Sequence, residues 1–352
     1  SSQREVPFSD SIVIEGTDGV IDLSRSRWDG EGGIVTWEKV GLPREETFAE
    51  LTAYRTSMRS TNFSCDTVEL TTPFETKVKG KINDRAKKGA LNESLELPYP
   101  QFLSFKASFD IPNFIEDVNY SGGFALEGEE FVGVGNSESP AQLTFMRNGK
   151  VFVKTASSQV RVSDKQLKAP NGKVTIYLGL QDSISHTGLD VSFVREANEL
   201  QLTRGNSGRS QSPFVNSYHK MDMYVEQIIW NRSESKLKLG FNFATSQQQR
   251  IARFESFDYY DERLYQRLQG MEQTHPLTAL YDYAYKYDKF TMDEGTAATA
   301  LKRTITQAKS TLLDLSTLGF IAYDTENGIV TVTQKTIHFV KAKARKSDFD
   351  NE

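Results

Sequence analysis

The hydrophobic period of the sequence changes near Phe254, and this change limits the folds that the chain can adopt. Before that position, short apolar runs alternate with polar residues, as in Leu189, Val191 and Phe193, and the runs end at Gly, Asn, Ser or Pro. A period of two is typical of antiparallel strands joined by tight turns. After Phe254, apolar residues recur every three or four positions, as in amphipathic helices. The sequence therefore predicts a mainly β chain that ends in a small helical module.

The β-rich part divides into two predicted units. Residues 77–97 are charged and do not alternate, and Pro98-Tyr99-Pro100 follows them, which favours a boundary near residue 98. We therefore expect a β-rich unit, a β-sheet domain and a helical module with a basic and acidic tail over residues 1–97, 98–255 and 256–352. The glycine-punctuated run 122–135 fits hairpins or the turns of a stacked sheet, so the antiparallel sheets can form a sandwich or a solenoid-like stack.

The alternation also predicts which side chains face the core of the sheets. We expect the apolar members to be buried, namely Ile176, Phe193, Leu239 and Phe241. We expect their polar neighbours to be exposed, namely Asp190, Lys238 and Asn242. The only cysteine, Cys65, cannot form an internal disulfide or a Cys-based zinc site, so we expect a buried residue beside a strand.

Three segments of the β-rich part lead to local expectations. The segment from Pro43 to Tyr54 has proline and acids at its start and apolar residues at helical spacing, so it favours a helix, although Ala53–Met58 fits a strand equally well. Asn171-Gly172 is typical of a two-residue hairpin turn. The segment Asp182–Gly188 concentrates hydroxyls, a carboxylate and His186, and we interpret it as a tight turn.

The C-terminal region repeats apolar residues at helical spacing in several segments. Helices are predicted near Tyr260, from Pro276, after the capping residue Asp293 and from Ile305 to a stop at Gly319. A short extended piece, residues 290–292, follows the second helix, and a hairpin over residues 320–333 closes the series. This order of elements resembles the winged-helix fold over about residues 274–346. The resemblance implies a small α+β domain.

An unusual run of tyrosines lies on the helix that begins at Pro276: Tyr281, Tyr283, Tyr285 and Tyr287. Residues two apart on a helix point in nearly opposite directions, so the four cannot share one face. We expect the module to pack on the β-domain or on a protein partner through Tyr281, Tyr285 and Leu277. A platform for stacking bases or sugars is the alternative.

The residue types needed for catalysis or metal binding do not occur in recognisable patterns. The four histidines show none of the close spacings of metal-ligand pairs, and no Gly-x-Ser-x-Gly elbow is present. Ser185 and His186 are strand neighbours that point to opposite faces, which disfavours a nucleophile and base pair. We therefore expect no catalytic residues, no cofactor and no metal.

The loop Gly205–Ser210 lacks the phosphate-loop ending, but Arg204 and Arg209 beside it can hold an anionic group.

Charge argues against nucleic acid as a partner. The net charge of the chain is −5, whereas DNA-binding proteins usually carry a basic surplus. Residues 276–352 contain ten Lys or Arg and ten Asp or Glu, and the turn Asp324–Gly328 of the last hairpin is acidic. In addition, no apolar run approaches the ~20 residues that cross a bilayer as a helix, so we expect no transmembrane segment.

Several stretches across residues 30–270 resemble parts of a little-characterised family of large, β-rich bacterial envelope proteins. They are Gly32-Gly33-Ile34-Val35-Thr36-Trp37, Ser121-Gly122-Gly123-Phe124, Phe145-Met146-Arg147-Asn148, Asp182-Ser183-Ile184-Ser185-His186 and the stretch Ser212-Pro213-Phe214 to Tyr218-His219. The resemblance implies an exported, periplasmic or envelope location. We expect a non-enzymatic structural or binding role through protein or glycan contacts. The alternatives are DNA binding through the winged helix and a hydrolase with a site assembled from scattered residues.

Overall fold

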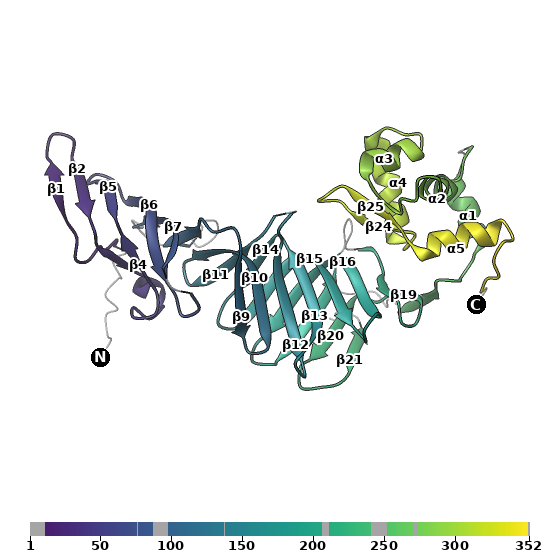
Figure 1. Cartoon of the computed structure of the whole chain (residues 1–352), viewed down its shortest axis with the longest axis horizontal. Coiled ribbons are helices and arrows are strands. Elements are labelled where there is room, and N and C mark those ends of the chain that lie inside the picture. Colours follow the sequence, from purple (N-terminus) through teal and green to yellow (C-terminus); the bar gives the residue numbers. More distant parts are fainter. Residues whose placement is uncertain are drawn as a thin grey trace, which may run out of the picture. The chain divides into compact units, whose positions relative to one another are not determined.

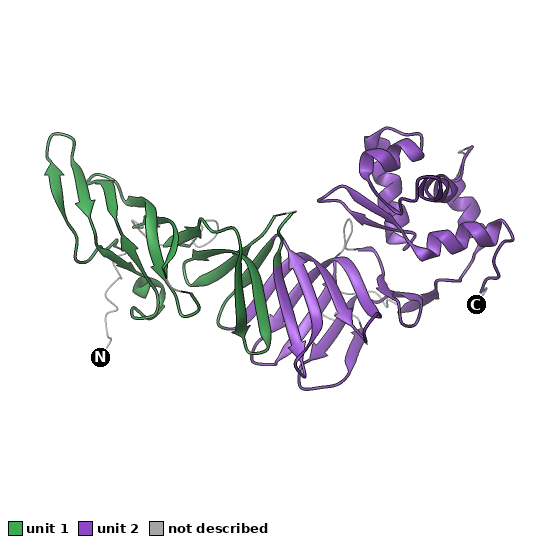
Figure 2. Cartoon of the chain, in the orientation of Figure 1, with its two compact units in different colours: residues 1–141, 159–164 green, residues 142–158, 165–352 purple. Residues whose placement is uncertain are grey.

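The computed structural model describes residues 11–75, 77–86, 98–136, 138–205, 211–240, 252–270 and 273–350. The chain forms two compact units, which are coloured separately in Figure 2. Unit 1 comprises residues 1–141 and 159–164, and unit 2 comprises residues 142–158 and 165–352. The fold is mainly β with antiparallel sheets, as the alternation predicted. The division into three domains and the choice between a sandwich and a solenoid remain predictions.

Unit 1 consists of short antiparallel strands and one turn of 3-10 helix, labelled in part in Figure 1. They are β1 (Asp18–Asp22), β2 (Arg27–Glu31), β3 (Ile34–Thr36), η1 (Glu38–Val40), β4 (Phe48–Leu51), β5 (Ala53–Ser57), β6 (Asn62–Thr71), β7 (Val78–Arg85), β8 (Gln101–Ser104), β9 (Phe109–Ile115), β10 (Val118–Glu127), β11 (Glu130–Val134) and β14 (Gln159–Val162). Strands β1, β2 and β5 form a small sheet of their own. The other strands pair in the series β3, β4, β6, β7, β8, β10, β11 and β14, with β9 on β10.

Aromatic side chains fill the core of the larger sheet of unit 1. The rings of Phe124 and Phe131 stack with 5.1 Å between their centroids, and Phe74 meets both of them edge-on. Cys65 is buried in β6, as predicted. The predicted helix over residues 43–54 is wrong, because Ala49 and Leu51 of β4 are buried at strand spacing between β3 and β6.

Unit 2 begins with a β-sheet and ends with helices. Its strands are β12 (Ala141–Arg147), β13 (Lys150–Ser157), β15 (Gln166–Tyr177), β16 (Ser183–Val194), β17 (Glu199–Arg204), β18 (Phe214–Asn216), β19 (Met221–Tyr224), β20 (Gln227–Asn231), β21 (Leu237–Gly240) and β22 (Arg253–Ser256). One series of pairings runs β13, β15, β16, β17, β20 and β21. A second branch leaves β16 through β18 and β19 to β22.

The predicted burial in this sheet is confirmed in its centre and fails at its margin. Ile176 and Phe193 are buried, and Asp190 and Lys238 are exposed. Leu239 is 43% exposed, which contradicts the prediction, because β21 pairs only with β20 among the described residues and none of its four residues is fully buried. Phe241 and Asn242 lie outside the described residues.

Both predicted turns in this part of the chain are wrong. Asn171 has a φ of +53°, but it lies inside β15, where the register with β16 shifts around Gly172. The conformation that suits a hairpin turn also suits the extra residue of a β-bulge. Residues 183–188 belong to β16, and the turn comes just before them, where the Leu178 N–H donates to the Asp182 carbonyl.

The C-terminal module follows β22 and contains the predicted helices and hairpin. Its elements are α1 (Glu262–Gln269), α2 (Pro276–Tyr287), β23 (Thr291–Asp293), α3 (Glu294–Ala300), α4 (Ile305–Thr317), β24 (Ile321–Asp324), β25 (Ile329–Val332) and α5 (Gln334–Lys343). Pro276 opens α2, the Asp293 carboxylate caps α3 and Gly319 follows α4 with a φ of +80°. The strands pair in the order β23, β25, β24. Helix α5 was not predicted.

Candidate functional site

Helix α2 places its tyrosines on two sides of the module. The imidazole of His275 caps the helix, since its Nδ1 accepts the Leu277 N–H at 3.1 Å. Leu277, Leu280 and Ala284 are fully buried in the core of the module. None of the tyrosines occupies these apolar positions, so they flank the buried stripe of the helix.

The four tyrosines form two pairs at helical spacing. The rings of Tyr281 and Tyr285 lie 4.5 Å apart between centroids, and those of Tyr283 and Tyr287 lie 4.6 Å apart. Tyr285 and Tyr287 remain 47% and 49% exposed. The two rings of each pair meet because residues four apart share a helix face. In each pair one ring is half-buried and the other is exposed.

The pair that contains Tyr285 continues into a larger surface. Phe290 meets the Tyr285 ring edge-on at 5.3 Å, and the Lys341 Nζ lies 5.8 Å from its centroid. We call Tyr281, Tyr285, Phe290 and Lys341 the Tyr285 surface. Burial raises the pKa of Tyr281, so its phenol stays neutral at physiological pH. Rigid aromatic rings beside a cation are common anchors in protein interfaces.

Leu277 was also predicted to contact a partner. It is fully buried in the core of the module, where it forms part of the buried face of α2. The guanidinium of Arg204 donates to the carbonyls of Val225 (3.1 Å) and Gln211, so it ties β17 to neighbouring backbone. Arg209 lies outside the described residues. Anion binding at this loop remains a prediction.

His186 lies in the segment Asp182–Gly188, whose residue types most resemble those of a catalytic site. Its hydrogen bonds are nevertheless those of a structural residue. The ring is buried, and its Nδ1 accepts the Gly188 N–H at 3.0 Å. The ring proton therefore lies on Nε2, which donates to the Ser212 carbonyl at 2.9 Å. The Ser212 Oγ lies 3.3 Å from the same Nε2. A nitrogen that already carries a proton cannot take one from Ser212, so this pair is not a nucleophile and base.

Within the described residues, no group of three or more His, Cys, Asp or Glu side chains is arranged to hold a metal ion.

A buried lysine joins the helical module to the sheet of unit 2. Lys335, at the start of α5, has a side chain that is only 2% exposed. Its Nζ contacts the Asp222 Oδ2 of β19 at 3.0 Å and the Glu255 Oε2 of β22 at 2.8 Å. It also donates to the Leu318 carbonyl at 2.8 Å and lies 3.2 Å from the Tyr224 hydroxyl, which itself donates to that carbonyl. We call these side chains the Lys335 network.

The charges in the Lys335 network balance. Burial acts to lower the pKa of Lys335, but the surrounding Tyr224, Asp222 and Glu255 outweigh it and raise the pKa, so the ammonium group stays charged. Burial raises the pKa of Asp222, against the attraction of Lys335. Arg253 lies 3.3 Å from Glu255 and supplies a second positive charge. No sequence pattern predicted this network, because the carboxylates are separated from Lys335 by 113 and 80 positions.

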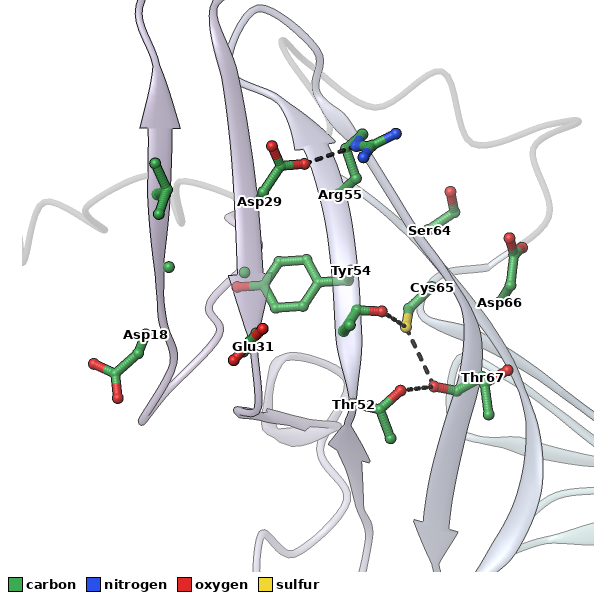
Figure 3. A pocket seen from close by; sticks show the side chains of 14 residues that line it. Asp18, Asp29, Glu31, Thr52, Tyr54, Arg55, Ser64, Cys65, Asp66 and Thr67 are labelled. Atoms are coloured by element: carbon green, nitrogen blue, oxygen red, sulfur yellow. Dashed lines mark hydrogen bonds and ion pairs between the residues drawn. The ribbon is translucent and has the colours of Figure 1, made fainter.

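Unit 1 contains a groove of about 780 Å³ beside its small sheet, shown in Figure 3. It is lined by Asp18, Gly19, Val20, Asp29, Gly30, Glu31, Thr52, Ala53, Tyr54, Arg55, Ser64, Cys65, Asp66 and Thr67. Tyr54 is held in place because its hydroxyl accepts the Trp28 Nε1–H at 3.0 Å. Arg55, the one basic residue of the lining, pairs with Asp29 at 2.7 Å. The remaining acids give the groove a negative character.

Comparisons of the chain with protein-family models, with curated proteins and with solved structures found no match. The described residues include no helix that is both long and apolar enough to span a membrane.

Proposed function

We propose that the chain is a non-enzymatic structural and binding part of a bacterial envelope protein, and that its C-terminal module binds a protein partner. The observation that carries this proposal is the Tyr285 surface, where an exposed tyrosine contacts a second one, with their rings tilted by 40°, beside Phe290 and Lys341. Anchors of this kind lose little side-chain entropy on binding, because their neighbours already hold them. The Lys335 network supports the proposal, since it fastens the module that bears the surface to strands β19 and β22.

We also propose a winged-helix-like architecture for the module. The order α2, β23, α3, α4, β24, β25 and the three-stranded sheet support it. This architecture brings in DNA binding as the second candidate function, with the exposed Thr306, Gln307 and Lys309 of α4 facing the major groove. Two contacts weigh against it. Lys309 is paired with Glu294 at 3.2 Å, and Glu326, in the turn of the hairpin, accepts a hydrogen bond from Asn171 of β15 at 2.6 Å.

Protein binding through the Tyr285 surface predicts a site-specific crosslink. A photoreactive phenylalanine analogue at Tyr285, in the full-length protein in its own cells, should give one discrete protein adduct in the envelope fraction. The same analogue at Tyr218, an exposed tyrosine elsewhere in unit 2, is the matched control and should give none. With the adduct's protein identified and purified, Tyr285→Ala should weaken its binding by about 2 kcal/mol, as for an interface anchor. Equal labelling from both positions, or unchanged affinity, would contradict the proposal.

DNA binding makes a different prediction. In a titration of the full chain with random-sequence duplex at low salt, we expect a Kd no tighter than about 1 μM, because phosphate neutralisation supplies most non-specific affinity and the module is neutral. Measured by fluorescence anisotropy, tighter binding that weakens steeply with added salt would restore the DNA-binding function. The variant Lys309→Glu serves as its control, since only a DNA-binding helix α4 would lose affinity through this change.

A further inference from the structure

Strand β1 of unit 1 is an open edge of its sheet. It pairs with β2 along its whole length, from Asp18 opposite Glu31 to Asp22 opposite Arg27, and with no other strand in the described part of the chain. An edge strand presents N–H and C=O groups that point away from its one neighbour. Figure 3 shows β1 at the border of the groove, and the residues Asp18, Gly19 and Val20 line that groove.

The side chains of β1 are unusually exposed for an apolar strand. Val20 is 70% exposed and Ile21, on the opposite face, is 46% exposed. Leu23, in the turn after the strand, is 85% exposed. Natural proteins commonly protect such edges with charges, because an apolar edge recruits other strands. Here the charges are Asp18 and Asp22. Asp22 already accepts a hydrogen bond from the Ser24 hydroxyl at 2.6 Å and pairs with Arg25 at 3.7 Å, so Asp18 is the acid that selects which strand can be added.

A second copy of the chain does not fit this edge. In an antiparallel pair of β1 strands centred on Val20, each Asp18 would lie opposite an Asp22, and like charges opposite each other destabilise a sheet. Alternation places Asp18, Val20 and Asp22 on one face, which β2 extends with Glu31, Asp29 and Arg27. Arg27 lies opposite Asp22, whereas Asp18 lies opposite Glu31, so the negative charge gathers at the Asp18 end of the strand. The fitting partner therefore has a basic residue beside Asp18 and an apolar residue two positions away, beside Val20.

We propose that β1 binds an extended segment of another protein by strand addition, and that this segment carries Lys or Arg opposite Asp18 and an apolar residue two positions away, opposite Val20. Its backbone pairs with the open edge of β1. Its basic side chain lies beside Asp18, and its apolar side chain covers Val20. The adjoining groove gives room for side chains of the segment. Affinity from the main chain and selectivity from alternate side chains are the general features of this mode of recognition.

The test uses the full chain and short labelled peptides in fluorescence anisotropy. The peptide Thr-Lys-Thr-Val-Thr-Lys-Thr should bind saturably below about 1 mM, and the same peptide with Glu in place of Lys should bind at least about tenfold more weakly. The variant Asp18→Lys should reverse this order. Asp110→Lys, which changes an exposed acid of β9 in the same unit, is the matched control and should leave it unchanged.

Two further measurements distinguish strand addition from other modes. N-methylation of alternate amides in the Lys peptide, on the side that meets β1, should abolish binding, because it removes the main-chain donors. Retained binding of the methylated peptide, or no saturable binding of the parent peptide, would overturn the proposal. Sedimentation of the chain alone tests the second copy as the occupant. A dimer that Val20→Lys converts to a monomer would overturn the proposal in favour of self-association.

Discussion

Replacement of Lys335 by methionine is expected to lower the free energy of unfolding of unit 2 by about 3–5 kcal/mol, because it leaves the buried Asp222 carboxylate without its counterion and Glu255 with Arg253 alone. Methionine keeps most of the volume of the side chain, so the loss reports the charge rather than a cavity. Asp222 is almost completely buried, so water cannot replace the ammonium group beside it. Urea-induced unfolding, followed through the buried Trp230 of β20, measures the effect.

A matched control and a second variant make this prediction specific. Lys238→Met changes an exposed lysine of β21 in the same unit and should stay within about 0.5 kcal/mol of the parent protein. Adding Asp222→Asn to Lys335→Met removes the unpaired charge, and should recover part of the lost stability. A loss below about 1 kcal/mol for Lys335→Met would show that the network does not hold the module to the sheet.

Gly319→Ala is expected to destabilise unit 2 by more than the ~1 kcal/mol that a left-handed backbone alone costs. The glycine has a φ of +80°, and a Cβ there would lie 2.4 Å from the Asp222 Oδ2. The carboxylate must then move away from Lys335, which weakens the network as well as straining the backbone. The comparison with Gly328→Ala, measured by urea-induced unfolding, separates the two effects.

Gly328 is the matched control because it shares the backbone conformation without the crowding. Its φ is +62°, and the nearest atom to an added Cβ is the Glu294 Cβ at 3.8 Å. The substitution there should cost only the backbone term. Equal losses at both glycines would mean that the Asp222 carboxylate adapts freely, and that the close contact at Gly319 has no energetic consequence.

Local patterns predicted the elements of this protein well where neighbours in sequence decide the outcome. The caps at Pro276 and Asp293, the stop at Gly319 and the final hairpin all depend on residues within one or two turns. Helix α5 was missed because its buried face mixes Lys335 and Thr336 with apolar residues. That pattern is not typical of an amphipathic helix. Only the distant carboxylates of the Lys335 network explain why a lysine is buried there.

The mistakes in the β-rich part share a physical cause. Alternation assigns side chains to the two faces of a strand, but it does not say whether another layer covers a face. For this reason the predicted burial of Leu239 was wrong. A positive φ at Asn171 fits a turn and a bulge equally well, so register alone separates them. The Tyr285 surface was partly predicted, since the spacing of the tyrosines is visible in the sequence. The groove and the Lys335 network depend on contacts between distant segments, which no local pattern encodes.

The Lys335 network also determines where this chain can be divided. A cut between Glu255 and Lys335 puts the ammonium group on one fragment and its carboxylates on the other. Each fragment would then expose a face built around a charge that lacks its counterpart. A module transplanted into another protein would therefore need strands β19 and β22 to travel with it. For the same reason, positions 222, 255 and 335 should change together when such a chain diversifies, although they are distant in the sequence.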